Sequence, residues 1–492
     1  MQNPFLPLDV YIPDGEPHVF GNRVYLFGSH DKENGDTYCM LDYEFWSAPV
    51  DDLSDWRCPG VSYSAKQDPD YGDELKYMYA PDVVRGNDGR FYLYYCMAGH
   101  KGQGGYGQKI SVAVCDTPDG KYEYYGFVRN PDGSPMKKYV TFDPAAINDN
   151  GTIRLYYGTW YPFHEYGRIL DPIFYLVESS MFSKSAREIR SYKDGIMGAN
   201  HVELADDMLT IKSEPRHIMP TKVRGTSFEK HPFFEGSSIR KINGIYYFIY
   251  SSLHGHELCY ATSEYPDRDF IFRGVIVSGG DVGYHGRRER DRLNATGTNH
   301  GSIECIDGQW YVFYHRNTNK TAYSRQACAE QIEILPDGSI PQVEITTQGL
   351  NEKPLIAKGK FPAVLCCNLT NGKMPHLGNG VIKKRIPYIT SEEEKRFVVV
   401  TPGTFATYKY FEFTGEPLKI TLSLDTECDG VISVISSENE IDLTVADIKI
   451  SRDQKVASAI CHLPKGRRDL SFLWHGNEDI RLYEFDIEGV LD

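Results

Sequence analysis

Residues 243–252 read NGIYYFIYSS, a glycine-containing turn followed by a strand crowded with aromatic and β-branched side chains. The same pattern occurs four more times, as GNRVYLFGSH from Gly21, DGRFYLYYC from Asp88, NGTIRLYYG from Asn150 and DGQWYVFYH from Asp307. A glycine in a tight turn supplies the positive φ that a short hairpin needs. Each copy therefore predicts a strand that begins directly after a hairpin.

Two of these strands are followed by a second element. ISVAVCDTPDGKYEYYG from Ile110 and LCYATSEYPDRDFIFRG from Leu258 each read as a strand, a Pro-Asp turn and another strand. A repeat thus holds three or four antiparallel strands, and the repeats are spaced by roughly 60–90 residues, as in β-propellers. Five copies predict a five-bladed β-propeller over residues 1–340. A β-sandwich would not repeat one hairpin signature at this interval.

The pattern changes after residue 340. Residues 341–354 are expected to form a linker, and residues 355–492 contain short alternating segments such as FATYKYFEF and LKITLSL. Such segments, about ten residues apart, predict a β-sandwich. The 492 residues also exceed what one hydrophobic core usually organises. We therefore expect an all-β chain with two domains.

Composition limits the class of partner. The net charge of −15 argues against nucleic acid and acidic membranes, and no segment approaches the length of a membrane span. The start MQNPFLPLDVYIPDGEP has no signal-peptide pattern, and the eleven cysteines are odd in number and scattered. These features predict a cytoplasmic protein with reduced thiols that handles a neutral ligand. A homo-oligomer remains possible.

Polar residues recur at one position of the repeat. Seven to nine residues before each hairpin glycine stand Asp14, Asp82, Asp143, Glu235 and His300. Equivalent positions of pseudo-symmetric blades converge, so these side chains are expected to surround one axial pocket. Glycoside hydrolysis needs one protonated carboxyl group for the leaving oxygen and one carboxylate that activates water. A third carboxylate raises the pKa of the acid by like-charge repulsion.

These motifs resemble glycoside hydrolase family 43, the β-xylosidases and α-L-arabinofuranosidases, over essentially the whole chain. The resemblance rests on PDGEP around Asp14, FDPAAINDNG around Asp143 and FFEGSSIRKINGIYYFIYSS around Glu235. It implies an inverting, exo-acting enzyme that releases xylose or arabinose from small plant-cell-wall oligosaccharides. It also implies that Asp14 is the base, Asp143 the pKa modulator and Glu235 the acid.

The resemblance extends to binding residues. His300 in NHGSI matches a channel histidine that helps to hold water or calcium, and Arg325 in SRQAC matches an arginine that reaches the sugar. No cofactor is required, although a structural calcium near the axis is possible. The C-terminal strands resemble a carbohydrate-binding-module-like sandwich. Phe142, beside Asp143, is expected to form a wall of the pocket, with the hydrophobic core as the alternative.

Several assignments leave alternatives. The family's base is usually followed by proline, whereas Asp14 is followed by Gly15, and Glu16 lies on the same strand face as a rival base. Asp82 fits a structural hydrogen bond in its turn as well as a substrate contact. His300 fits a core histidine, and Arg325 fits a partner for a blade carboxylate.

The motif His254-Gly255-His256-Glu257 invites a zinc site, but no third ligand is apparent, so a loop or a wall of the sugar site is expected. For function, the alternatives are an arabinan- or galactan-active hydrolase of the same fold and a non-catalytic carbohydrate-binding propeller.

Overall fold

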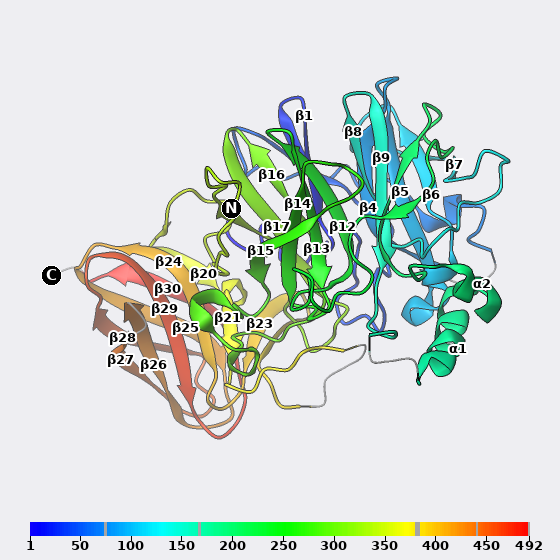
Figure 1. Ribbon diagram of the computed structural model, residues 1–492. Coiled ribbons are helices and arrows are strands. Elements are labelled where there is room, and N and C mark those ends of the chain that lie inside the picture. Colours follow the sequence, from blue (N-terminus) through cyan, green and yellow to red (C-terminus); the bar gives the residue numbers. More distant parts are fainter. Residues whose placement is uncertain (73–75, 166–168, 379–383, 439–440, 491–492) are drawn as a thin grey trace.

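The computed structural model describes residues 1–72, 76–165, 169–378, 384–438 and 441–490 (Figure 1). Five separate antiparallel sheets form in the described residues before 340. The first joins β1 (Glu16–Phe20), β2 (Arg23–Phe27) and β3 (Trp46–Pro49). The second joins β4 (Lys76–Arg85), β5 (Phe91–Gly99), β6 (Ser111–Cys115) and β7 (Glu123–Phe127).

The third sheet joins β8 (Ala145–Asp149), β9 (Thr152–Thr159), β10 (Gly198–Leu204) and β11 (Arg216–His217). The fourth joins β12 (Phe233–Ile242), β13 (Ile245–Ser252), β14 (Glu257–Ser263) and β15 (Ile271–Ser278). The fifth joins β16 (Ser302–Ile306), β17 (Gln309–Asn317) and β18 (Arg325–Ile332). The five repeated segments are β2, β5, β9, β13 and β17, so the strands predicted after hairpins are confirmed.

The repeated strands are nearly continuous apolar runs because both of their faces are covered. In β13, Phe248 and Tyr250 pack in a core with Tyr156 of the third sheet. On the other face of β13, Tyr247 and Ile249 pack in a core with side chains of the fifth sheet. Each sheet is thus sandwiched between its neighbours, and the hydrophobic core lies between the sheets.

The first strands of the five sheets lie side by side around a common axis. β12 contacts β8 and β16, β8 contacts β4, and β1 contacts β16. A parallel bridge between Gly15 and Gly301 also joins the first and fifth sheets. The contact of β2 with β4, through a core shared by the first and second sheets, closes the ring. The segments that carry the candidate site residues therefore enter the middle of the ring.

Two further six-stranded sheets follow. One contains β19 (Leu355–Ile356), β21 (Asn368–Thr370), β24 (Phe405–Phe413), β26 (Gly430–Glu438), β27 (Ile441–Ile450) and β29 (Gly466–His475). The other contains β20 (Gly359–Pro362), β22 (Tyr388–Glu392), β23 (Lys395–Val400), β25 (Pro417–Asp425), β28 (Val456–His462) and β30 (Ile480–Gly489). They enclose a common core that includes Tyr408, Phe485 and Trp474.

Helices are few. In the described residues, α1 (Asp171–Phe182) and α2 (Ala186–Ser191) lie between β9 and β10, at one side of the ring (Figure 1). Short 3₁₀ turns are η1 (Ala65–Gln67), η2 (His100–Gly102), η3 (Gly105–Gly107), η4 (Tyr284–Gly286), η5 (Glu289–Asp291) and η6 (Ala363–Leu365). None of the described helices combines the length and apolar character that crossing a membrane requires. The chain is all-β apart from these insertions.

The C-terminal sheets pack against the ring. Tyr323 and Ala322 of the ring share a core with Met374, Leu377 and Ile386. Arg396 on β23 pairs with Glu33 at 2.8 Å. The ring of Tyr323 also lies 4.7 Å, edge to face, from that of Tyr38, which lines a cavity in the middle of the ring of sheets. The second unit therefore supports one wall of that cavity.

Deletion of residues 341–492 is expected to lower stability more than chemistry. The deletion uncovers the apolar side chains around Tyr323, and each fully buried side chain of this size contributes about 1.5–3 kcal/mol. Thermal unfolding and turnover per soluble enzyme measure the two effects. A truncated chain with the parent's melting temperature and activity would show that the unit is a detachable accessory.

Candidate active site

A cavity of about 360 Å³ opens in the middle of the ring. Its lining includes six of the seven residues that the sequence singled out: Asp14, Phe142, Asp143, Glu235, His300 and Arg325. They come from four different sheets: Asp14, Phe142, Asp143 and His300 lie just before the first strand of a sheet, Glu235 lies near the start of β12, and Arg325 begins β18. Of the five residues that the repeat placed around one pocket, Asp14, Asp143, Glu235 and His300 line this cavity and Asp82 does not.

The backbone is left-handed at two of these positions and at the glycine that follows a third. Asp14 has φ 57° and Asp143 has φ 43°, conformations that cost energy for a residue with a side chain. Gly236, directly after Glu235, has φ 74°, and a Cβ atom there would lie 3.0 Å from the ring of His300. The sharp bends turn the neighbouring carboxyl groups into the cavity, and Gly236 leaves room for the histidine.

Asp14 is held in its ionised form. Burial opposes its charge, but Arg325 donates from Nη1 to Asp14 Oδ1 at 2.8 Å, and His315 and His300 lie nearby. The positive charge of Arg325 is the largest of the contributions that outweigh burial and hold the pKa of Asp14 below its ordinary value. A carboxylate that stays ionised suits a base.

Asp143 and Glu235 are two buried carboxyl groups whose pKa values are both raised. Burial raises the pKa of Glu235 to about 8, with the charge of Asp14 adding to the effect and Arg325 opposing it. Burial and the charge of Glu235 also raise the pKa of Asp143. The Gly236 N–H donates to Asp143 Oδ2 at 3.0 Å, which favours negative charge on Asp143. The proton that the pair retains is thus best held by Glu235.

Arg325 is fixed by a residue that the sequence did not reveal. Asp31 accepts from Arg325 Nε at 2.8 Å and from Nη2 at 3.0 Å, a bidentate contact, and both side chains are buried. The guanidinium group also lies 4.8 Å from the ring centre of Tyr38. Arg325 therefore pairs with a carboxylate, Asp31, and also lines the cavity, so the two alternatives predicted for it are compatible.

His315 is a second residue that the sequence did not reveal. Its Nδ1 accepts the backbone N–H of Asp14 at 3.1 Å, so its proton lies on Nε2, which faces Thr298 O. Burial and the charge of Arg325 lower its pKa to about 3. His315 therefore acts as a neutral support for the loop of Asp14. Its place at the end of the repeated segment DGQWYVFYH was the available signal.

Asp82 lies outside the cavity lining. Its carboxylate contacts His18 Nε2 at 2.7 Å and accepts from the Ala146 N–H at 2.6 Å, which joins the second sheet to the third. Five residues connect β4 to β5, whereas two connect β1 to β2. Asp82 and Asp14 are equally far in sequence from their hairpin glycines, but the longer connection leaves Asp82 closer to the end of its strand than Asp14 is. In the second sheet, Tyr79 and Ala80 line the cavity instead.

Glu16, the rival base, also lies outside the cavity lining. It accepts from Arg240 Nη1 at 2.7 Å and from Ser238 Oγ at 2.9 Å. Burial raises its pKa to about 7, and Arg240 opposes the shift. The carboxylate of Glu16 is thus bound by buried side chains of the fourth sheet and does not face the cavity.

Aromatic side chains complete the cavity. Tyr79, Tyr106, Phe142, Tyr161 and Phe234 line it. The ring of Phe142 lies 4.7 Å from that of Tyr106, so Phe142 belongs both to the wall and to the packing behind it. Aromatic walls exclude water and offer flat faces to a sugar ring.

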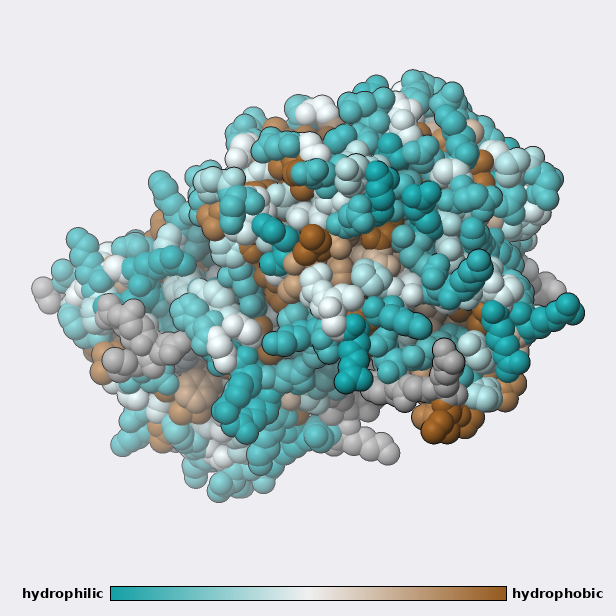
Figure 2. Space-filling view, in the orientation of Figure 1, coloured by the Kyte–Doolittle hydropathy of each residue, from teal (hydrophilic) through white to brown (hydrophobic). Residues whose placement is uncertain are grey.

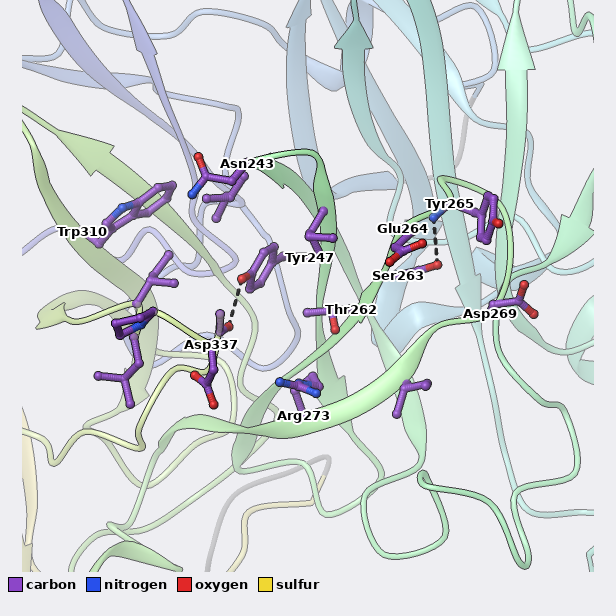
Figure 3. A pocket seen from close by; sticks show the side chains of 17 residues that line it. Asn243, Tyr247, Thr262, Ser263, Glu264, Tyr265, Asp269, Arg273, Trp310 and Asp337 are labelled. Atoms are coloured by element: carbon purple, nitrogen blue, oxygen red, sulfur yellow. Dashed lines mark hydrogen bonds between the residues drawn. The ribbon is translucent and has the colours of Figure 1, made fainter.

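A larger groove of about 760 Å³ lies elsewhere, between the fourth and fifth sheets (Figure 3). Trp310, Tyr247 and Arg273 line it, but none of the candidate catalytic residues does.

His254 and His256 do not form a zinc site with Glu257, because both approach Glu289, at 3.1 Å and 3.5 Å, while Glu257 binds His231.

Comparison with known proteins shows the family. The family model for glycosyl hydrolases family 43 matches residues 1–340. A xylosidase/arabinosidase of Thermoclostridium stercorarium is 40% identical over 501 residues, covering 99% of this chain and 98% of the relative. One of Bacteroides ovatus is 30% identical and covers 62% of this chain and 86% of the relative.

Among solved structures, a β-xylosidase/α-arabinofuranosidase from a compost metagenome aligns with a TM-score of 0.52 at 24% identity, covering 70% of this chain and 97% of that one. The resemblance read from the sequence motifs is thus confirmed, and so is the prediction of an enzyme. The chain is a glycoside hydrolase that belongs to glycosyl hydrolases family 43.

Proposed function

We propose that the enzyme is an exo-acting, inverting glycosidase that releases xylose, arabinose or both from small xylo- or arabino-oligosaccharides. The observation that carries the proposal is one small cavity into which Asp14, Asp143 and Glu235 open in different electrostatic environments. Relatives named xylosidase/arabinosidase support the choice of sugar. The cavity of about 360 Å³ is near the lower end for ligand sites, which favours binding of a single terminal sugar.

In this proposal Asp14 is the general base and Glu235 the general acid. Asp14 stays ionised beside Arg325 and removes a proton from the water that attacks the anomeric carbon. Glu235 has a pKa raised to about 8, so it keeps its proton near neutral pH and donates it to the leaving oxygen. The glycosidic bond breaks as the bond from water forms on the opposite face, so the anomeric configuration inverts.

Asp143→Asn is expected to move the upper limb of the pH profile of kcat/KM to lower pH. After burial, the charge of Glu235 is the next cause that raises the pKa of Asp143. Repulsion between two like charges is mutual, so we expect removal of the Asp143 charge to make ionisation of Glu235 easier. The enzyme then loses its protonated acid at a lower pH than the parent does. A pH profile of the variant against the parent measures the shift. An unmoved upper limb would mean that Asp143 orients the sugar or the acid without tuning its proton.

Release of sugar from nitrophenyl xyloside, arabinofuranoside and galactoside tests the substrate. Proton NMR of the first-formed sugar tests the stereochemistry, and a retained anomer would contradict inversion. Preference for galactoside would favour the galactan-active alternative, and a longer arabinan substrate serves as the second comparison. A chain that hydrolyses none of them but binds oligosaccharides would be the non-catalytic propeller.

Other parts of the proposal concern architecture and setting. We take the five sheets as the blades of a five-bladed propeller over residues 1–340, followed by a linker at 341–354 and a sandwich domain at 355–492. Support comes from the contacts that join each sheet to the next around a closed ring. A cytoplasmic location stays a prediction; the eleven cysteines are unpaired in the structure, as a reducing compartment requires.

A structural calcium near the axis also stays a prediction. His300 Nδ1 lies 3.8 Å from Asp14 Oδ1 and 3.9 Å from Asp143 Oδ2. Calcium takes six to eight oxygen ligands, and Arg325 already occupies Asp14 Oδ1. The side chains around His300 would therefore hold the ion mainly through water, and catalysis as proposed does not depend on it.

A further inference from the structure

The outer face of α1 is an exposed apolar surface. Ile169, Leu170, Ile173, Leu176 and Val177, which we call the α1 face, all belong to the exposed large hydrophobic residues. Ile169 is 93% exposed, Ile173 57% and Leu176 67%. Figure 2 shows strongly hydrophobic side chains at the lower right, where Figure 1 places α1. Five of the fifteen exposed large hydrophobic residues in the described chain thus fall within nine positions.

The spacing of the α1 face is that of a helix-packing seam. Leu170 is the N-cap of α1, Ile173, Leu176 and Val177 follow it by three, six and seven residues within the helix, and Ile169 lies just before it. Apolar residues at this period form one stripe along a helix, which normally packs against another helix. No other part of the described chain covers this stripe.

The opposite face of α1 is already packed. The ring of Phe174 stacks on that of Phe163 at 5.2 Å, and Phe182 meets Tyr106 of the cavity wall at 5.9 Å. Asp171 and Glu178 contact the two ring nitrogens of His164, at 2.9 Å and 3.1 Å. The inner face therefore attaches the helix to the ring, and the apolar outer face has no role in that attachment.

We propose that the α1 face pairs with the α1 face of a second copy of this chain across a two-fold axis. Charge favours this occupant, because the only acidic residues of α1 turn inward to His164. Two copies of a protein with a net charge of −15 can thus approach here without placing carboxylates opposite each other. An anionic lipid surface would be repelled by that net charge, and aliphatic side chains offer a sugar neither a flat ring nor a hydrogen bond.

The area of the α1 face fits such a pair. Its exposed apolar surface is on the order of 500 Å² per copy, near the largest patch that monomers usually tolerate. Pairing would bury about 1,000 Å² in total, the lower bound for a specific interface. In an isologous contact the same patch serves on both sides, so a single stripe is sufficient.

Sedimentation velocity of the full chain tests the proposal. We expect a species of twice the 56.0 kDa chain mass at micromolar concentrations. Ile173→Lys and Leu176→Lys should each weaken the pair at least about tenfold, because a charge would be buried against its own copy. Ile460→Lys on β28 is the matched control, since Ile460 is 63% exposed but lies outside the α1 face. All three positions are exposed, so the melting temperatures should stay near that of the parent.

Cross-linking tests whether the contact is isologous. Ile173 lies in the middle of the α1 face, so Ile173→Cys should form a disulfide-linked dimer on mild oxidation, whereas Ile460→Cys and the parent should not. A parent chain that stays monomeric, or a dimer that survives both lysine variants, would overturn the proposal. So would equal weakening by Ile460→Lys. These readouts are mass and cross-linking, so the outcome is independent of the proposed sugar specificity.

Discussion

Replacement of Asp14 by asparagine is expected to lower kcat on the order of 10³-fold while the fold is kept. Asparagine has the shape of aspartate and still offers Oδ1 to the Arg325 guanidinium group, which donates to Asp14 at 2.8 Å. It cannot take a proton from water. The variant should therefore bind the sugar and fail at the chemical step. Steady-state kinetics on a nitrophenyl pentoside, with a melting curve beside it, measures both effects.

Glu16→Gln is the matched control for Asp14→Asn. Both replace a buried carboxylate on the same strand segment, but Glu16 binds Arg240 and Ser238 outside the cavity. Loss of its charge leaves Arg240 without one of its buried partners, so we expect a lower melting temperature. Its kcat should stay near that of the parent. If Asp14→Asn were nearly as active as the parent and Glu16→Gln inactive, Glu16 would be the base.

The repeated hairpin made much of the fold predictable. A strand such as β13 is covered on both faces, so its sequence is an uninterrupted apolar run, and Gly244 at φ 85° marks the turn before it. The same repetition located Asp14, Asp143, Glu235 and His300, because positions equivalent in sequence converge at an axis. These features are local and periodic, which is why single-sequence reasoning reaches them.

The rest depends on contacts between distant segments. Asp31 follows β2 in an ordinary loop, and only folding brings it to Arg325, 294 residues away. Asp82 has the expected spacing, but the longer β4–β5 connection changes its depth in the ring. The insertion that forms α1 and α2 interrupts the repeat between β9 and β10. Its apolar residues have a helical spacing, so they are not part of the repeated hairpin pattern.

Replacement of Glu235 by glutamine is the second large loss that we expect, and its size should depend on the leaving group. A general acid matters most when the departing oxygen is strongly basic. When a xylo-oligosaccharide is cleaved, the departing group is a sugar oxygen that would leave as a strongly basic alkoxide unless the acid protonates it. Nitrophenolate is weakly basic and leaves readily without a proton. The fall in kcat/KM should therefore be on the order of 10³-fold or more for xylobiose and clearly smaller for nitrophenyl xyloside.

The pH dependence gives an independent check of the acid. With the proposed roles, activity of the parent requires Asp14 ionised and Glu235 protonated. The pKa of Asp14 is depressed, so activity should persist to acid pH, and it should fall as pH rises through about 8, where Glu235 loses its proton.

Because Asp143 and Glu235 titrate as a pair, the upper limb reports the pair. Glu235→Gln cannot lose a proton there, so its residual activity on nitrophenyl xyloside should stay level across that range. An equal loss on both substrates, with the upper limb retained, would place the acid at another residue of the cavity.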